Sequence, residues 1–423
     1  MRQSLLSLLE RGVAEKDLGL MRQQMRDKAK LFIACCWLAC WHCGAAAFCA
    51  SMQTANVLRV GRDQAWATPS AAASVARDGD VIEIAQGQYD GDVAVWPQSH
   101  LVIHGIDRPH IAANGAHAQG KGTWIFTGEN IIIENIELSG SRVPDGNGAA
   151  IRFEGTSITV RDCYIHDNQN GFLCGENDQS DVRIENCEFA NNGAGDGQTH
   201  NIYVGHVNSL TVQFSYVHHA IIGHNVKSRA ATNFILYNRI MDEADGTSSY
   251  AIDLPSGGQG FIIGNLIQQG PDADNYNAMS FGAEGLDHGR NELYVINNTF
   301  VNDRDPGVFM RIVDGTSIVR VINNIFYGDG KIVDGQALLL ANLTVPKVTD
   351  PSLGKTAEFL DVAQYDYRLT SESSAINKGI EPGTVNGYDL KPVAQYIHPL
   401  RGQKRLAVGT IDIGAYEYMN VGK

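Results

Sequence analysis

The chain has 423 residues, of which 43% are hydrophobic and 19% are charged, so it can bury a core and is not disordered overall. Its 33 Lys and Arg against 47 Asp and Glu give a formal net charge of −14, which argues against a nucleic-acid-binding protein, because such proteins present a basic surface. Apart from a borderline stretch near the start, no apolar run reaches the ~20 residues that a membrane span needs.

The start of the chain has the pattern of a targeting segment. Basic residues within 22–30 precede a short apolar stretch, Leu31–Cys43, and small residues follow at Gly44–Ala47. This order is typical of a signal peptide with its cleavage site, so residues 1–47 are predicted to be removed and the mature protein to be periplasmic or secreted. Translation could instead begin at Met21 or Met25, and a buried N-terminal helix is the alternative interpretation.

A short helix is predicted next. Thr68 precedes Pro69, which suits the first helical position, and Gly79 follows a predicted helix over Ser70–Arg77. The first strand is then expected at Asp80–Ile84. Because the first edge of a sheet needs cover, this helix is predicted to be an N-terminal cap.

A six-residue pattern recurs eight times further along the chain. It has an aliphatic residue first, Asn, Asp or a substitute third, a small residue or Asn fourth, and an aliphatic residue or Phe last; the copies are Ile133–Leu138, Val160–Ile165, Ile184–Phe189, Val212–Val217, Ile235–Ile240, Ile262–Ile267, Val295–Phe300 and Val321–Phe326. Successive starts are 27, 24, 28, 23, 27, 33 and 26 residues apart. This period is too short for pairs of helices and fits coils of short strands.

The repeat therefore predicts an all-β chain, a single-stranded parallel β-helix over residues 57–340, with a C-terminal tail over 341–423 that packs on it or extends it. Equivalent residues of successive coils would lie about 4.8 Å apart, so aliphatic side chains stack inside and Asn side chains form hydrogen-bonded ladders at turns. Cys163 and Cys187 share one repeat position and are predicted to be buried thiols, with a disulfide as the alternative.

These residues resemble the right-handed parallel β-helix proteins of the pectate-lyase-like superfamily. The resemblance rests on Gly79–Tyr89, on the repeated Asn motifs, and on the C-terminal stretches Tyr367–Leu369, Ser374–Gly379 and Asp412–Glu417. It implies a right-handed coil. Members of that superfamily include polysaccharide lyases, hydrolases and epimerases, so the fold does not settle the activity.

Candidate site residues lie on the strand before each motif. Because side chains alternate between the two faces of a strand, Asn225, Lys227 and Arg229 are expected on the outer face of one coil. Lys227 lies 8 residues before its motif, and Tyr203 and Asp253 each lie 9 before theirs, so the three are predicted to form one column. Further contacts to substrate are predicted from Arg152, Arg311, His200 and His224.

Such a column would form a positive groove suited to an acidic, uronate-containing polysaccharide. The predicted reaction is β-elimination, in which Lys227 or Tyr203 removes a proton beside the uronate carboxylate and a cation stabilises the developing charge. Repulsion from Arg229 and His224 is expected to help Lys227 act as a base, and Asp253 to orient the base.

The segment around Lys227 is also similar to the catalytic region of polysaccharide lyase family six. That resemblance implies a lysine base, matched by Lys227, and an assisting arginine one coil further, where this chain has Asp253. Ala220 and Ile222 stand where acidic calcium ligands of that family are expected.

Several alternatives remain open from the sequence. Lys227, Arg229 and Asp253 could be a salt-bridge ladder on a solvated strand, and His200 and His224 could be structural. No metal site is assigned, although carboxylates could hold Ca²⁺; they are Asp242, Glu243, Asp245, Asp272 and Asp274. Asp253 with Glu284 could be the carboxylate pair of a hydrolase. The function could also be non-catalytic glycan binding or uronate C5-epimerisation, and a monomer is expected.

Overall fold

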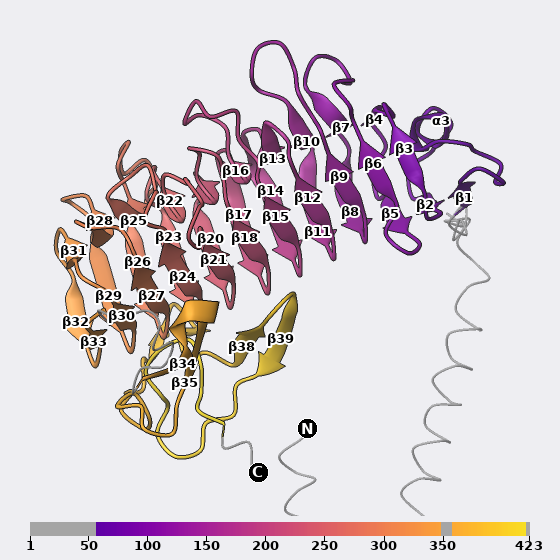
Figure 1. The fold of residues 1–423 in the computed structure, drawn as a ribbon. Helices are drawn as coiled ribbons and strands as arrows, with labels where there is room; N and C mark the ends of the chain where they lie inside the picture. The colour runs from indigo at the N-terminus through magenta and orange to yellow at the C-terminus, as the bar shows by residue number, and fades with distance from the viewer. Residues whose placement is uncertain (1–55, 348–357, 420–423) are drawn as a thin grey trace, which may run out of the picture. The chain divides into compact units, whose positions relative to one another are not determined.

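The computed structural model describes residues 56–347 and 358–419, and almost all of their regular structure is β-strand. The predicted targeting segment, residues 1–47, lies outside the described residues. Consecutive strands belong in turn to three sheets of parallel strands, and each coil of the chain stacks on the previous one (Figure 1). Within the described residues, no helix is both long and apolar enough to cross a membrane.

The first sheet, here called sheet A, has 12 strands: β1 (Val57–Val60), β2 (Val81–Ile84), β5 (Val102–Gly105), β8 (Glu129–Glu134), β11 (Thr156–Arg161), β14 (Asn177–Glu185), β17 (Val207–Gln213), β20 (Thr232–Leu236), β23 (Gln259–Ile263), β26 (Glu292–Ile296), β29 (Ile318–Ile322) and β32 (Leu338–Leu340). Sheet B has 11: β3 (Gln88–Asp90), β6 (His110–Ala112), β9 (Glu137–Ser139), β12 (Tyr164–His166), β15 (Glu188–Ala190), β18 (Tyr216–His218), β21 (Arg239–Met241), β24 (Leu266–Gln269), β27 (Thr299–Asn302), β30 (Ile325–Tyr327) and β33 (Leu343–Val345). Sheet C has 10: β4 (Ala94–Trp96), β7 (Gly122–Phe126), β10 (Ala149–Phe153), β13 (Asn170–Cys174), β16 (Ile202–Val204), β19 (Val226–Ser228), β22 (Ile252–Leu254), β25 (Asn277–Phe281), β28 (Val308–Ile312) and β31 (Lys331–Asp334). The predicted parallel coil is therefore confirmed.

The core lies between the three sheets and consists of the side chains that point inward at alternate positions of the strands. Phe300 and Phe326 stack with ring centroids 5.4 Å apart on successive coils. Cys163 and Cys187 are buried free thiols, as predicted, and burial raises the pKa of Cys187 well above its usual value. Aliphatic and aromatic burial of this kind supplies the main favourable free energy of folding.

The repeated motif turns the chain from sheet A into sheet B. Its third residue has a left-handed backbone, for example Asn135 at φ 54° and Asn323 at φ 58°, a conformation that Asn and Asp adopt more readily than most residues. The fourth residue points inward, and in the later coils it forms the predicted ladder: Asn238, Asn265 and Asn298 are linked by amide hydrogen bonds of 3.0 and 2.9 Å. Each amide therefore satisfies its neighbours inside the coil.

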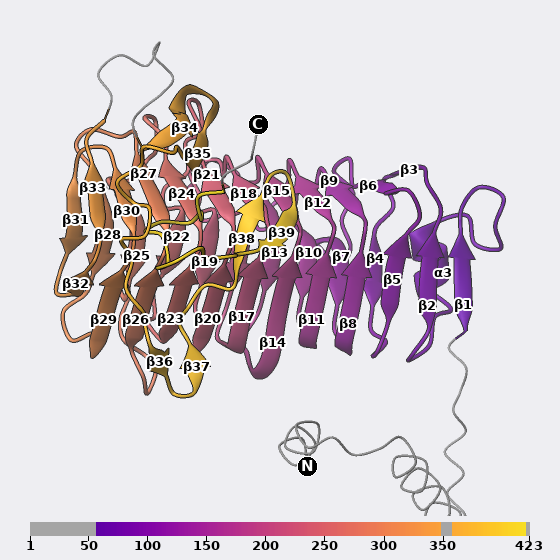
Figure 2. The same ribbon diagram turned by 90° about the horizontal axis from the view of Figure 1, so that it is seen from below.

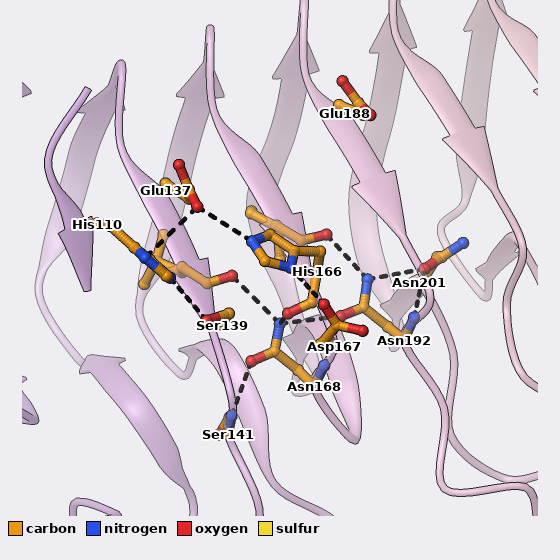
Figure 3. Close-up of polar contacts among 12 residues, drawn as sticks. His110, Glu137, Ser139, Ser141, His166, Asp167, Asn168, Glu188, Asn192 and Asn201 are labelled. Atoms are coloured by element: carbon orange, nitrogen blue, oxygen red, sulfur yellow. Dashed lines mark hydrogen bonds and ion pairs between the residues drawn. The ribbon is translucent and has the colours of Figure 1, made fainter. Parts of the chain in front are cut away.

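A second ladder, which the sequence analysis did not identify, lies at the turn from sheet B into sheet C. Asn168, Asn192 and Asn201 are linked by bonds of 2.9 and 2.8 Å (Figure 3). The chain of bonds continues from Asn201 to Asn225 at 2.8 Å and from Asn225 to the carboxylate of Asp242 at 3.2 Å. Two rows of buried amides thus hold two of the three corners in register.

The predicted N-terminal helix is present but short, because α3 spans only Pro69–Ala73. Thr68 accepts a hydrogen bond from the backbone N–H of Ala71, and Pro69 stands at the first helical position. The helix contacts β1 and β4. Its role as a cap stays a prediction.

Residues 358–419 pack against the outside of the later coils, as the yellow segment of Figure 2 shows. They contain β34 (Phe359–Asp361), η2 (Val362–Gln364), β35 (Asp366–Leu369), β36 (Thr384–Val385), β37 (Tyr388–Asp389), β38 (Ala394–Ile397) and β39 (Arg401–Lys404). Asn297 donates to the backbone oxygen of Asp412 at 2.8 Å, and Tyr237 accepts from the N–H of Val393 at 3.1 Å. The predicted limits of the coil and the tail stay predictions.

Candidate functional site

The register of sheet C places the predicted column side by side. Tyr203 pairs with Lys227 and Lys227 with Asp253 on β16, β19 and β22. Val226 and Ser228, which flank Lys227 on β19, are fully buried. The alternation that predicted an outward Lys227 is therefore confirmed. The catalytic roles of the three outward residues stay predictions.

Lys227 stands between two carboxylates. Its ammonium nitrogen lies 3.2 Å from Glu284 Oε1 and 3.9 Å from Asp253 Oδ2, and 5.7 Å from the centre of the Tyr203 ring. Only 14% of the Lys227 side chain is exposed. The ammonium is therefore a half-enclosed positive charge with acidic neighbours.

Arg229 joins the same group from the end of β19. Its guanidinium donates to the phenol oxygen of Tyr203 at 3.2 Å, to Ser256 Oγ at 3.2 Å and to Glu284 Oε2 at 2.6 Å. Each oxygen of the Glu284 carboxylate therefore contacts a different cation, Lys227 or Arg229. Partial burial raises the pKa of Glu284, but the hydrogen bond from Arg229 and the attraction of Lys227 outweigh it and lower the pKa.

Glu284 was predicted only as half of a carboxylate pair with Asp253, and its contacts with the two cations were not predicted. Glu284 follows β25, and its backbone N–H donates to the backbone oxygen of Pro255 at 2.9 Å. Nothing in the strand pattern indicates where the segment after β25 folds, so no sequence signal placed Glu284 over the column.

Asp253 is the most perturbed carboxylate of the group. Its exposed fraction is 3%, and burial raises its pKa to about 6; Glu284 also raises the pKa, while Lys227 and Arg229 lower it. Since a carboxyl group with this pKa changes its protonation state in mildly acidic solution, Asp253 can exist in either state near the pH at which many enzymes work.

His200 and His224 are buried next to the column. Their rings stack with centroids 4.6 Å apart, and the backbone N–H of His224 donates to His200 Nδ1 at 2.9 Å. Burial lowers the pKa of both, that of His224 to about 3, so His224 is uncharged at neutral pH. The predicted like-charge repulsion of Lys227 by His224 is therefore wrong.

Three other predicted contact residues lie apart from this cluster. Asn225 is fully buried in the second ladder, so its prediction as an outward residue is wrong; the turn before β19 directs its side chain inward. Arg152 and Arg311 occupy the same row, as predicted, but Leu173 separates Arg152 from Tyr203 and Ser280 separates Arg311 from Asp253.

An open cleft of about 550 Å³ adjoins the cluster. It is lined by residues 145–147 and 196–200 and by the side chains of Tyr203 and Lys227. Asp145 and Asp196 belong to its wall, and Arg152 lies 3.2 Å from Glu154. The groove is therefore of mixed charge rather than positive as expected, because carboxylates accompany the outward cations.

The carboxylates considered for Ca²⁺ do not gather around a common point. Asp242 is buried and accepts from Ser248 at 2.6 Å, Glu243 pairs with Arg239 at 3.3 Å, and Asp245 pairs with His219 at 3.1 Å. Within residues 56–347 and 358–419, the group of His, Cys, Asp and Glu side chains with metal-binding spacing is on sheet B and consists of His110, Glu137 and His166.

Comparison with known proteins agrees with this architecture. Residues 97–238 match a family model described as a right handed beta helix region. The chain has the right-handed parallel β-helix fold. A search of curated proteins finds no match to the β-helix chain.

Solved structures similar to this β-helix are distant in sequence. Pectate lyase Pel9A is 13% identical, with a TM-score of 0.50 over 86% of this chain and 97% of that one, which confirms for the fold the predicted resemblance to pectate-lyase-like proteins. The ORF18 protein of Geobacillus virus E2 is 13% identical, with a TM-score of 0.43 over 65% of this chain, and the match covers 56% of the viral chain. A pectin methylesterase mutant in complex with a hexasaccharide is 12% identical, with a TM-score of 0.32 over 74% of this chain and 95% of that one.

Proposed function

We propose that this β-helix protein cleaves an acidic, uronate-containing polysaccharide by β-elimination at the cleft beside Tyr203 and Lys227. One observation carries the proposal: Lys227 and Arg229 already hold a single carboxylate, that of Glu284, and the same Arg229 donates to the Tyr203 phenol. A uronate carboxylate has the same chemistry. That a pectate lyase shares the fold supports this substrate class.

In this proposal the substrate carboxylate takes the place of Glu284. The Glu284 side chain is 48% exposed and can turn toward solvent, whereas the side chains of Lys227 and Arg229 are only 14% and 17% exposed and stay in place. The two cations then stabilise the negative charge that develops on the uronate carboxylate as the neighbouring carbon loses its proton.

Of the two candidate bases, Tyr203 is the better placed. Its oxygen faces the guanidinium of Arg229 at 3.2 Å, which stabilises negative charge on that oxygen. Lys227 already contacts the carboxylates of Glu284 and Asp253, so its place in the cluster suits the binding of a carboxylate. Tyr203, as its phenolate, takes the proton, and the electrons of the C–H bond form the new double bond. The glycosidic C–O bond breaks with its electrons on the leaving oxygen, which takes up a proton from the newly formed Tyr203 phenol or from water.

The test is incubation with alginate, pectate and chondroitin while the absorbance of unsaturated uronate ends is followed. Tyr203→Phe is expected to lower the rate about 10²- to 10⁴-fold, the usual contribution of a general base, and Lys227→Met to lower it as well. Tyr276→Phe is the matched control, because Tyr276 also faces a cation, Arg304 at 4.6 Å, but is exposed outside the cluster.

The outcomes separate the alternatives. Absence of unsaturated ends with all three polymers contradicts elimination on them. Binding without cleavage would then indicate a glycan-binding protein, and inverted sugar stereochemistry without cleavage would indicate an epimerase. Undiminished cleavage by Tyr203→Phe would remove Tyr203 as the base.

We also propose that the protein is exported and meets its polymer in the periplasm or outside the cell. Residues 1–47, on which this proposal rests, lie outside the described residues. N-terminal sequencing of the protein from cell fractions tests it: export predicts a new N-terminus near residue 48, and an intact N-terminus in the cytoplasmic fraction contradicts it.

A further inference from the structure

A second group of chemically active side chains lies on the outer face of sheet B. His110, Glu137 and His166 come from β6, β9 and β12, strands of three successive coils (Figure 3). Glu137 Oε1 lies 3.5 Å from His110 Nδ1 and 3.3 Å from His166 Nε2. One ligand atom of each residue lies within 4.8 Å of the other two.

The second nitrogen of each imidazole is already engaged. His166 Nδ1 lies 2.6 Å from Asp167 Oδ2, and His110 Nε2 lies 2.7 Å from Ser139 Oγ. An ionised carboxylate only accepts hydrogen bonds, so the contact with Asp167 places an N–H at His166 Nδ1 and leaves Nε2 as the nitrogen that faces Glu137.

The spacing of the three ligand atoms suits a metal ion. Bonds of about 2.0–2.1 Å from a tetrahedral Zn²⁺ to nitrogen and oxygen place ligand atoms roughly 3.3 Å apart. The two distances from Glu137 Oε1 to the histidine nitrogens are 3.3 and 3.5 Å. Two imidazoles with one carboxylate favour a transition metal over Ca²⁺ or Mg²⁺, which prefer oxygen ligands.

The hydrogen bonds to Asp167 and Ser139 also fit this assignment. Histidines that ligate a metal usually donate their other N–H to a carboxylate or another acceptor, which fixes the tautomer and the ring orientation. Tyr164 further fixes the His166 ring by stacking on it, with centroids 4.1 Å apart. The ligands are thus held in place before an ion arrives.

The fold provides an internal comparison two coils later. There Glu188 lies 3.4 Å from His218 Nε2, and Tyr216 stacks on His218 at 3.9 Å, so the Glu, Tyr and His arrangement recurs. However, the residue paired with Glu188 on the previous coil is Tyr164, whereas the residue paired with Glu137 on the previous coil is His110. Only the first arrangement has a third ligand.

We propose that His110, Glu137 and His166 form a binding site for a divalent transition-metal ion such as Zn²⁺, with room for water or a substrate group as a further ligand. Their side chains are 24%, 25% and 14% exposed, so solvent reaches the group. The site is on sheet B and the cleft beside Tyr203 and Lys227 is on sheet C, so the metal site does not depend on the proposed elimination reaction.

The test is Zn²⁺ binding by the full chain, measured by titration calorimetry and by the metal content after dialysis. Five cysteines between residues 35 and 49 can bind Zn²⁺ themselves, so the result is the difference between variants. The unaltered chain is expected to bind one more ion than His110→Ala, His166→Ala or the nearly isosteric Glu137→Gln. His218→Ala, the matched control, should bind as many ions as the unaltered chain.

A graded variant tests the geometry itself. Asp167→Ala keeps all three ligands but removes the acceptor of His166 Nδ1, so the affinity for Zn²⁺ should fall about 10- to 100-fold without loss of the site. Far-ultraviolet circular dichroism checks that each variant is folded. Equal Zn²⁺ stoichiometry in the unaltered chain, His110→Ala, His166→Ala and Glu137→Gln would overturn the proposal.

Discussion

Asp253 is predicted to make the folded protein less stable at neutral pH than the same protein with a neutral side chain there. Burial raises its pKa to about 6 from the ordinary 3.8, so folding favours the protonated carboxyl group. The stabilising contribution of that proton is complete below about pH 4 and is lost as the pH rises through 6.

The size of the effect follows from the two pKa values. At about 1.36 kcal/mol per pKa unit, the difference between 3.8 and about 6 corresponds to about 3 kcal/mol. Asp253→Asn replaces the carboxylate by a neutral group of nearly the same shape. It should therefore raise the free energy of unfolding by about 3 kcal/mol at pH 7 and leave it almost unchanged at pH 4.

Urea unfolding of both proteins between pH 4 and pH 8 measures the difference. The control is Glu284→Gln, for which the opposite sign is expected. The contacts with Arg229 and Lys227 lower the pKa of Glu284, so its stabilising contribution is present above about pH 4.5 and lost as the pH falls through its folded value. If Asp253→Asn were less stable than the unaltered protein at pH 7, the raised pKa of Asp253 and the argument built on it would be wrong.

Three further substitutions test the contacts that hold the coil and the tail. Asn265→Ala should lower the free energy of unfolding by about 1–3 kcal/mol for each buried group left unpaired, measured by urea unfolding, because Asn265 links Asn238 to Asn298. Phe300→Ala should cost about 3–5 kcal/mol in the same assay through the cavity left in the aromatic stack, and a cost below 1 kcal/mol would contradict that packing. Arg405→Ala should cost about 3–5 kcal/mol and make residues 358–419 sensitive to protease, because it leaves Glu417, only 3% exposed, without its cation; unchanged proteolysis would contradict this.

The fold was predictable because the coil repeats its chemistry. The Asn motif fixes the left-handed turn residue and the inward amide in each coil, so one pattern gave both the period and the ladder. Once the period is known, strand alternation assigns each residue to the inner or the outer face. This placed Tyr203, Lys227 and Asp253 in one row, although they are far apart in the sequence.

Residues outside the strands were not predictable in this way. Glu284 reaches the two cations from a segment after β25, and Asn225 turns inward in the residue before β19, where strand alternation does not yet apply. His110, Glu137 and His166 are different, because they do lie on strands and repeat with the coil. The predicted row lies on sheet C, on the strand before each motif, whereas these three residues lie on sheet B, on the strand that follows the turn of the motif.

The burial of the charged column bears on whether it is a salt-bridge ladder on a solvated strand. Such a ladder keeps its charged groups in water and contributes little to stability. Here Asp253 is 3% exposed, and its raised pKa means that attraction to Lys227 and Arg229 does not offset the desolvation of its carboxylate. A neutral side chain at that position would avoid this desolvation and so favour folding. A charge held at a cost to stability, beside Lys227 at the cleft, supports the proposed binding or catalytic role over a purely structural one.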